Sequence, residues 1–312
     1  MAAKLTVALL AGGRSSEREV SLKGGEEVYK ALDKKRYEIR RYDPATDLGR
    51  LAAEAAEIDV AFILLHGPFG EDGTMQGFLD MLDIPYQGAG VLGSAMAMDK
   101  HVAKLMYRQA GLTVPDWHTV EKGGDWSGKE ILAHLGLPLV IKPLSQGSSV
   151  GMSIVDNGDE LGPALDKAFA FDRRVMIEKF IAGREITGGV IGNDEPIALP
   201  LVEIIPGDQY RFFDYEAKYQ PGASREICPA EFDDLTTVRA QEFALAAHRA
   251  LMLEVYSRTD MIVNDSGIYV LETNTIPGMT PTSLLPQAAR AHGLSFPAFL
   301  DRLLELALEK KR

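Results

Sequence analysis

The sequence predicts a mixed α/β and α+β protein of two or three domains that share a cleft. Its 312 residues exceed what one hydrophobic core usually holds. The first hundred residues alternate apolar runs with helical patterns, as parallel sheets covered by helices do. The remainder consists of shorter strands and helices and includes a hairpin near its end.

The N-terminal hundred residues predict an α/β domain with three layers. Residues 5–10 and 59–65 are almost continuously apolar, which is typical of strands buried on both faces. Helical composition at 21–32 and 48–57 flanks a possible edge strand at 37–42. A further helix is indicated by apolar residues at i, i+3, i+4 and i+7, namely Met75, Phe78, Leu79 and Leu82.

From about residue 99 the pattern predicts a small α+β lobe. Its first helix is expected to present one apolar face, made of Val102, Leu105, Met106 and Ala110. The pattern then predicts three strands and a helix, in the order 139–142, 152–155, 159–170 (the helix) and 174–178.

The last part, from about residue 185, predicts long strands, a polar loop at 206–224 and two helices. The first helix is indicated by Phe243, Ala246, Ala247, Ala250 and Leu251, and the second closes the chain at 296–308. Between them, residues 258–263 and 269–274 form two apolar runs separated by a turn of composition Asn-Asp-Ser-Gly, which predicts a hairpin.

This hairpin carries a candidate metal site. Glu272 and Asn274 are two residues apart, so they share one face of their strand, and the turn folds Asp260 back beside Glu272. Oxygen ligands of this kind suit Mg²⁺. Arg258 shares the face of Asp260. The alternative is that these acids are simply solvated, as most Asp and Glu side chains are.

Composition restricts the class of protein. A net charge of −12 argues against a nucleic-acid-binding face. The one cysteine, Cys228, has no partner for an internal disulfide, and we find neither a signal peptide nor an apolar run of transmembrane length. We therefore expect a cytoplasmic protein that associates with neither nucleic acid nor membranes.

Residues 145–151, SQGSSVG, form a candidate phosphate loop between two strands, directly after Lys142-Pro143. Such a loop exposes backbone N–H groups, and a lysine on a rigid strand can hold a phosphate. No Gly-Lys-Ser/Thr follows, so this is not a Walker A loop. A flexible hairpin loop is the alternative.

Two segments of the N-terminal domain are candidate substrate contacts. The loop at 11–21 follows the first strand but lacks G-x-G-x-x-G, and Glu17 and Glu19 suit an ammonium group better than a pyrophosphate. They could also merely complement the helix dipole. His66 follows the second buried strand, at the sheet edge where ligands bind, although a histidine at such a position is often structural.

Two later loops complete the set of candidates. Residues 212–219 carry four aromatic side chains, which predicts either a lid over a site or an oligomer contact. Residues 277–284 follow the hairpin at once, and there Gly278 and Ser283 could donate hydrogen bonds to an anion.

Taken together, these parts suit phosphoryl transfer from ATP to a small substrate. They do not separate a kinase from a ligase that forms an acyl phosphate. A nucleotide-binding regulatory protein is a competing hypothesis, and an oxidoreductase is a more distant one.

Nearly the whole chain resembles the D-alanine–D-alanine ligase family of the ATP-grasp superfamily. The resemblance rests on nine motifs in order: SEREVS (16–21), LHG (65–67), EDGT (71–74), MDK (98–100), KP (142–143), GSSVG (147–151), DYEAKY (214–219), RTD (258–260) and ETNTIPGMT (272–280). It implies an ATP-grasp fold, in which an N-terminal Rossmann-like parallel-sheet domain at 1–98 precedes two lobes, at 99–184 and 185–312, that enclose ATP.

The resemblance also implies where ATP and metal bind. Its phosphate lysines match Lys100, Lys142 and Lys218. The linker that contacts adenine matches Glu178, Lys179, Phe180 and Ile181, and the ribose ligand matches Glu185. Two Mg²⁺ ions, for which Mn²⁺ can substitute, would lie on Asp260, Glu272 and Asn274.

The implied reaction joins two D-alanine molecules through an acyl phosphate, for peptidoglycan precursor synthesis. Glu17 matches the residue that holds the first ammonium, and His66 a histidine near it. Arg258 and the N–H of Gly278 match oxyanion stabilisers, while Ser283 and Leu284 match contacts to the second carboxylate.

In the same resemblance, Ser148 and Tyr219 match residues that pin the lid shut. A tyrosine at position 219 favours an amine nucleophile, although ligation to D-serine or D-lactate stays an alternative. Phe213 departs from a tyrosine found in some members, which puts one minor lid contact in doubt. The family further suggests a homodimer that associates through the N-terminal domain.

Overall fold

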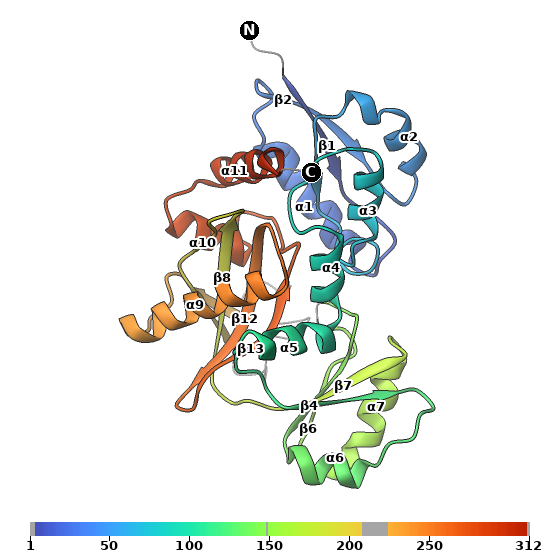
Figure 1. Cartoon of the computed structure of the whole chain (residues 1–312), viewed down its shortest axis with the longest axis vertical. Coiled ribbons are helices and arrows are strands. Elements are labelled where there is room, and N and C mark those ends of the chain that lie inside the picture. Colours follow the sequence, from blue (N-terminus) through green and yellow to red (C-terminus); the bar gives the residue numbers. More distant parts are fainter. Residues whose placement is uncertain (1–3, 148, 208–223, 311–312) are drawn as a thin grey trace.

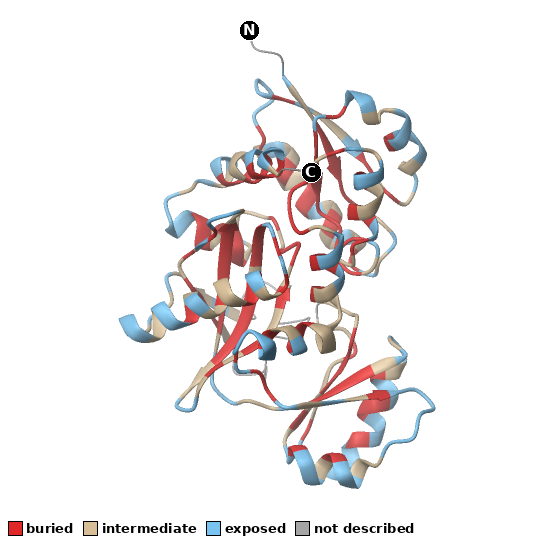
Figure 2. Ribbon diagram, in the orientation of Figure 1, coloured by how far each residue is buried: buried red, intermediate tan, exposed pale blue. Residues whose placement is uncertain are grey.

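The computed structural model describes residues 4–147, 149–207 and 224–310, which form three β-sheets (Figure 1). An N-terminal parallel sheet lies at one end of the molecule, a six-stranded sheet lies in the middle, and a four-stranded sheet lies at the other end. Figure 2 shows that buried residues follow the sheets, whereas the outer faces of the helices are exposed.

In the N-terminal sheet, β1 (Leu5–Leu10) lies between β2 (Tyr37–Tyr42) and β3 (Val60–Ile63), and all three are parallel. Alternate residues of β1 enter different cores: Val7 and Leu9 join α1 (Arg18–Ala31) and α11 (Phe296–Glu309). Ala8 and Leu10 face α2 (Leu48–Ala53) and α3 (Thr74–Met81) on the other side. The predicted three layers and the edge position of β2 are confirmed. The helix predicted at 48–57 is broken, because a 3-10 turn, Ala55–Glu57, replaces its second half.

The close approach of α1 to the end of β1 depends on Gly25. A Cβ added there would lie 2.6 Å from the Cβ of Ala11. We expect Gly25→Ala to lower the free energy of unfolding by about 1 kcal/mol, because overpacking of about 1 to 3 kcal/mol exceeds the helix-propensity gain. Gly49→Ala in α2 is the control, since no atom lies within 4 Å of its added Cβ, and it should be neutral or stabilising. Thermal denaturation checks both, and a Gly25→Ala protein that melts above the wild type would contradict the packing argument.

The four-stranded sheet is antiparallel in the order β4 (Trp117–Glu121), β7 (Arg174–Lys179), β5 (Leu139–Pro143) and β6 (Ser153–Val155). The 3-10 turn Gly158–Glu160 leads into α7 (Leu161–Phe169), which covers one face together with α6 (Gly128–Leu135). Leu139 and Ile141 of β5 point into that core. The alternate residues Val140 and Lys142 therefore lie on the opposite face. The strands at 139–142, 152–155 and 174–178 and the helix at 159–170 are confirmed, but β4 and α6 were not predicted.

The six-stranded sheet is antiparallel in the order β11 (Ser224–Ile227), β10 (Val202–Pro206), β8 (Arg184–Gly192), β12 (Val255–Asn264) and β13 (Gly267–Asn274), with β9 (Ile197–Ala198) beside β8. One face packs on α4 (Val91–Met98), α5 (Lys100–Gln109) and α9 (Asp234–Ala250). The other face packs on α10 (Leu284–Ala291) and α11. Helix α11 thus joins this sheet to the N-terminal sheet in one core. Neither α4 nor α10 was predicted.

Helix α5 was predicted correctly, but its buried face was not. The expected apolar face included Leu105, which is 47% exposed. The buried residues are Ala103, Lys104 and Tyr107. The prediction was wrong because the true inner face of the helix includes a charged residue, which interrupts the apolar periodicity. That residue is Lys104, whose charge is neutralised by Glu178 of β7.

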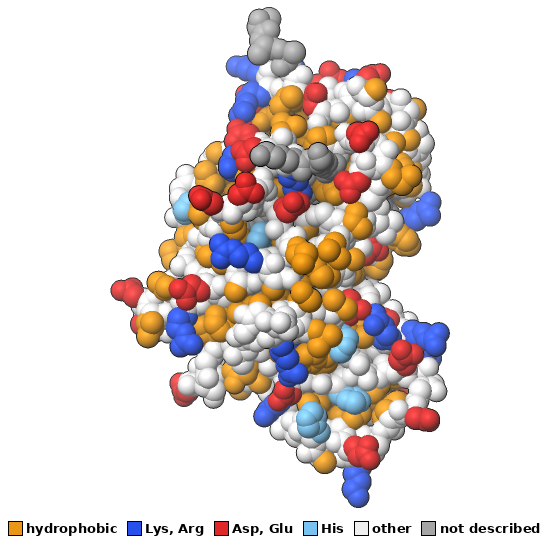
Figure 3. All heavy atoms as spheres, viewed as in Figure 1, with side chains coloured by type: hydrophobic (Ala, Val, Ile, Leu, Met, Phe, Trp, Pro, Cys, Tyr) orange, Lys and Arg blue, Asp and Glu red, His pale blue; other side chains and the backbone are white. Residues whose placement is uncertain are grey.

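The surface agrees with the mixed charge of the sequence. On the face shown in Figure 3, acidic and basic side chains alternate without a continuous basic area. Within the described part of the chain, we find no helix with the length and apolar character needed to cross a membrane.

Candidate active site

The hairpin of β12 and β13 brings together the side chains predicted to bind metal. Its register pairs Asp260 with Glu272 and Arg258 with Asn274, so all four residues share one face of the hairpin. Arg258 donates to both oxygens of Asp260, from Nε at 3.1 Å and from a terminal nitrogen at 2.9 Å. The Asn274 amide also donates to Oδ2 of Asp260, at 3.1 Å. The predicted spacing therefore becomes a connected polar cluster.

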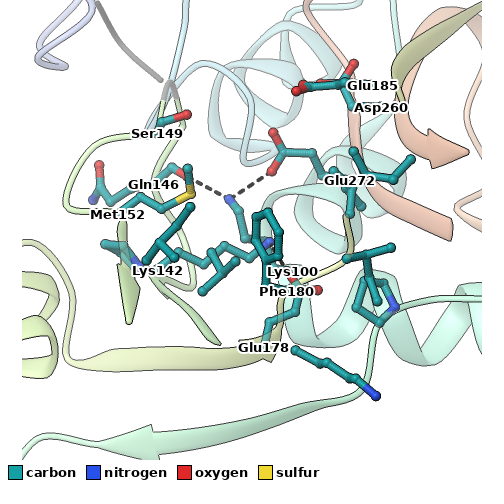
Figure 4. A pocket seen from close by; sticks show the side chains of 18 of the residues that line it. Lys100, Lys142, Gln146, Ser149, Met152, Glu178, Phe180, Glu185, Asp260 and Glu272 are labelled. Atoms are coloured by element: carbon teal, nitrogen blue, oxygen red, sulfur yellow. Dashed lines mark hydrogen bonds and ion pairs between the residues drawn. The ribbon is translucent and has the colours of Figure 1, made fainter. Parts of the chain in front are cut away.

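Lys100 links this cluster to the loop that starts at residue 144. Its Nζ lies 3.4 Å from Oε2 of Glu272 and donates to the carbonyl oxygen of Gln146 at 2.7 Å (Figure 4). Lys100 occupies the first turn of α5, where the side chain of Asp99 accepts from the N–H groups of His101 and Val102. The capped end of the helix therefore holds Lys100 between the hairpin and the loop.

The donor set fits a hard divalent cation. Asp260 and Glu272 offer carboxylate oxygens, and Asn274 can offer its carbonyl oxygen while its NH₂ group binds Asp260. Across residues 4–147, 149–207 and 224–310, no group of three or more His, Cys, Asp or Glu side chains is arranged to hold a metal. Phosphate or water oxygens would therefore have to complete the shell of an ion here.

A pocket separates the four-stranded sheet from the hairpin, and it collects most of the residues assigned above to nucleotide and metal. Nine of them line it: Lys100, Lys142, Glu178, Lys179, Phe180, Ile181, Glu185, Asp260 and Glu272. Figure 4 shows the lysines and the acids of the two sheets facing the same space. Apolar side chains, among them Val140, Met152 and Leu271, form the remaining walls. An acid- and lysine-rich end beside an apolar slot suits a nucleoside triphosphate.

The ammonium group of the buried Lys142 is paired with the carboxylate of Glu178. Its Nζ lies 2.7 Å from Oε2 of Glu178, and the other carboxylate oxygen contacts Lys104, which is completely buried. Burial favours the neutral form of Lys142, but the charges of Glu178 and Glu272 outweigh it and raise its pKa. Lys104 was not among the candidate residues, because its partner lies on a strand distant in sequence.

Glu17 is the N-cap of α1 and is buried, with 7% of the residue exposed. A Cβ added to Gly67 or to Gly147 would come within 3.0 or 3.1 Å of Oε2 of Glu17. The carboxylate is therefore enclosed between the loop after β3 and the loop after β5. Burial lowers the pKa of His66, which interacts electrostatically with Glu17 and Arg258, so we expect a neutral imidazole at pH 7.

Glu71, the first residue of the EDGT motif at 71–74, was not among the candidate site residues, but it lies near Glu17. Its Oε2 accepts from the N–H of Gly67 at 2.7 Å. Burial, followed by repulsion from Glu17, raises the pKa of Glu71 to about 8. Glu71 thus carries a proton at neutral pH.

This shift predicts a pH-dependent stability. Above its unfolded pKa, Glu71 is ionised in the unfolded chain but protonated in the folded one, so stability falls as pH rises from about 4.5 to about 8. Glu71→Gln removes that loss and still accepts from Gly67. Its melting temperature should match the wild type near pH 4.5 and exceed it by at least about 2 °C at pH 8, the shift expected for about 1 kcal/mol. Exposed Glu242→Gln is the control, and a gap independent of pH would refute the assignment.

The residues assigned to the oxyanion and to the second carboxylate follow the hairpin. A Cβ on Gly278 would lie 3.2 Å from Oγ of Ser283, so these two residues are neighbours. The Ser283 hydroxyl is 2.8 Å from Oγ1 of Thr280 and accepts from the Thr280 N–H at 3.1 Å. Ser283 is the N-cap of α10, and the buried Leu284 begins that helix. A helix N-terminus of this kind favours a carboxylate.

Three assigned residues, Ser148, Lys218 and Tyr219, lie outside the described residues, as does the whole predicted lid at 212–219, including Phe213.

An N-terminal parallel sheet followed by two antiparallel sheets, with a pocket of lysines and acids between the latter two, defines an ATP-grasp fold. Two family models match the chain: "D-ala D-ala ligase N-terminus" at residues 40–89 and "D-ala D-ala ligase C-terminus" at 106–305. The chain belongs to the D-alanine–D-alanine ligase family.

Similar proteins cover almost the whole chain. It is 60% identical over 306 residues to a D-alanine–D-alanine ligase of Syntrophobacter fumaroxidans, covering 98% of both chains. A D-alanine–D-alanine ligase of Desulfotalea psychrophila is 57% identical over 313 residues, and the match covers all of this chain and 97% of that one. The Bacillus anthracis D-alanine–D-alanine ligase complexed with ATP superposes with a TM-score of 0.86 at 38% identity, over 97% of each chain. The VanG D-Ala:D-Ser ligase of Enterococcus faecalis gives 0.84 at 32% identity, over 98% of this chain and all of that one.

Proposed function

We propose that this protein joins two D-alanine molecules to D-alanyl-D-alanine and converts one ATP to ADP and phosphate, for peptidoglycan precursor synthesis. Family membership and the 60% identical relative support the ligase activity. The observation that carries the proposal is that nine of the residues assigned to nucleotide and metal line the same pocket.

Within this proposal, ATP lies between the four-stranded sheet and the hairpin. Lys100 and Lys142 hold its phosphates, with Lys218 from the segment that is not described. Glu185 binds the ribose, and residues 178–181 contact the adenine. Bound Mg²⁺, held by Asp260, Glu272 and Asn274, would neutralise charge on the phosphates. The ATP complex of the Bacillus anthracis ligase supports the nucleotide part of this arrangement.

The first D-alanine binds where Glu17 and His66 lie, with its ammonium on Glu17. Its carboxylate attacks the γ-phosphorus of ATP, the bond to the β–γ bridging oxygen breaks, and an acyl phosphate and ADP form. The amine of the second D-alanine then attacks the acyl carbon, while its own carboxylate rests at Ser283 and Leu284. Arg258 and the N–H of Gly278 stabilise the oxyanion that forms, and phosphate leaves. Ser148 and Tyr219 close the lid, which excludes water that would hydrolyse the acyl phosphate.

A coupled assay of the purified protein tests the proposal. ADP release should require both D-alanine and Mg²⁺ and should yield one dipeptide per ADP. ADP release without dipeptide would refute the ligase assignment.

Ligation of D-alanine to D-serine is the second candidate, because the VanG D-Ala:D-Ser ligase superposes over nearly the whole chain. Competition among D-alanine, D-serine and D-lactate across pH separates the possibilities. An amine must lose its proton to attack, whereas a hydroxy acid need not. We expect D-alanine to be preferred over both competitors. Its preference over D-lactate should increase with pH, whereas its preference over D-serine, which also attacks through an amine, should change little.

We further propose a cytoplasmic homodimer that associates through the N-terminal domain, with domain limits at 1–98, 99–184 and 185–312. Light scattering gives the molar mass, and a monomer at micromolar concentration would contradict the dimer.

A further inference from the structure

Helix α5 buries a lysine that the proposed reaction does not use. Lys104 has no exposed surface, and its ammonium contacts Oε1 of Glu178. The ammonium also lies 5.6 Å from the centre of the Trp117 ring. Burying a charge in this way is costly unless a partner compensates it, so its position calls for an explanation.

The strand register explains how Glu178 comes to lie between two lysines. In β7, Glu178 is opposite Trp117 of β4 on one side and Val140 of β5 on the other. Lys142 is two residues from Val140 and therefore shares its face, which brings its Nζ to 2.7 Å from Oε2 of Glu178. Lys104 approaches from α5 and takes the other oxygen.

Two cations keep Glu178 ionised despite its burial. Burial alone would raise the pKa of Glu178, but Lys104 and Lys142 outweigh it and lower the pKa. Burial lowers the pKa of Lys104 itself to about 8, so its ammonium persists at pH 7. An ionised carboxylate only accepts hydrogen bonds, and its remaining lone pairs suit the 6-amino group of adenine but oppose the 6-carbonyl of guanine.

We propose that Lys104 is a positioning residue for nucleotide selection: by holding Oε1 of Glu178, it fixes this carboxylate as an acceptor for the amino group of a 6-aminopurine. The proposal rests on the proposed function in one respect, namely that adenine lies against residues 178–181. Removal of Lys104 leaves Glu178 to Lys142 alone, so the carboxylate can turn toward the phosphate lysine and away from the base.

The test compares ATP with purine riboside triphosphate, which lacks only the 6-amino group, by calorimetric binding to the full-length protein. We expect the wild type to prefer ATP by about tenfold, the value of one such hydrogen bond. Lys104→Met should bind ATP about tenfold more weakly and the analogue unchanged, whereas Lys104→Arg should restore most of the preference. Arg108→Met is the matched control, because Arg108 contacts the same Trp117 ring from the next turn of α5 but is exposed and does not touch Glu178.

Each outcome is decisive. A wild type without preference would refute the adenine contact at Glu178, while the ligase activity would still be tested separately by dipeptide formation. A Lys104→Met protein that keeps the preference, or that loses affinity for both nucleotides equally, would refute the positioning role. If Lys104→Met does not fold by circular dichroism, Lys104→Gln removes the same charge. Adding Glu178→Gln to either neutral variant should reduce the preference no further.

Discussion

Glu272→Gln is expected to lower kcat by about 10² to 10³, because it removes one of two carboxylates from the candidate metal site. Metal ions supply several kcal/mol of charge stabilisation in phosphoryl transfer, and each 1.36 kcal/mol corresponds to a tenfold rate change. The substitution keeps the shape of the side chain, which is 28% exposed, so the fold should be retained. Lys100 keeps its bond to the Gln146 carbonyl oxygen.

Measuring dipeptide formation against Mg²⁺ concentration distinguishes the causes. A weakened site should require more Mg²⁺ for half-maximal rate, and saturating Mg²⁺ should recover part of the loss. Glu242→Gln, an exposed acid on α9, is expected to behave like the wild type. Unchanged turnover in Glu272→Gln would show that the metal assignment is wrong.

Arg258→Met is expected to reduce kcat by about 10² to 10³, the loss of about 3 to 4 kcal/mol that follows removal of one oxyanion donor. The KM values for ATP and D-alanine should change little, because the oxyanion exists only in the transition state and intermediate. Arg258→Lys keeps a positive charge but loses the two parallel bonds to Asp260, so it should lie between the wild type and Arg258→Met.

Arg258 also contacts a candidate metal ligand, and this second role must be separated from the first. If Arg258 acts through Asp260, Arg258→Met should need more Mg²⁺ yet reach nearly the wild-type rate at saturation. A rate that stays low at saturating Mg²⁺ supports the oxyanion role. Arg302→Met on α11 controls for the loss of an arginine whose ion pairs are with two exposed acids, Glu305 and Glu309.

The hairpin could be predicted from the sequence because its information is local. The turn at 264–267 sets the register as far as Met261, which lies opposite Val270. A β-bulge between Asp260 and Met261 then shifts the pairing by one residue and places Asp260 beside Glu272, and this bulge was not predicted. The parallel strands at 5–10 and 59–65 could also be predicted locally, from their almost continuous apolar runs.

The contacts of Lys104 and Glu71 could not be predicted, because each depends on how separate strands and loops meet. Lys104 is neutralised by an acid 74 positions further along the chain, and the pKa of Glu71 depends on enclosure by segments that the sequence alone does not place. Short elements such as β4 and α10 were missed because few residues carry too weak a periodic signal.

Helix α5 sends three side chains from one face to three different parts of the site. Lys100 reaches Glu272, Lys104 reaches Glu178, and the hydroxyl of the buried Tyr107 donates to Oγ1 of Thr273 at 2.8 Å. These positions follow one another at four and three residues, the repeat that keeps side chains aligned along a helix. A single inserted residue would rotate everything after it by about 100° and detach the later contacts together. The three contacts therefore fix the length of the helix between Lys100 and Tyr107, and an insertion that a surface loop would tolerate is excluded there.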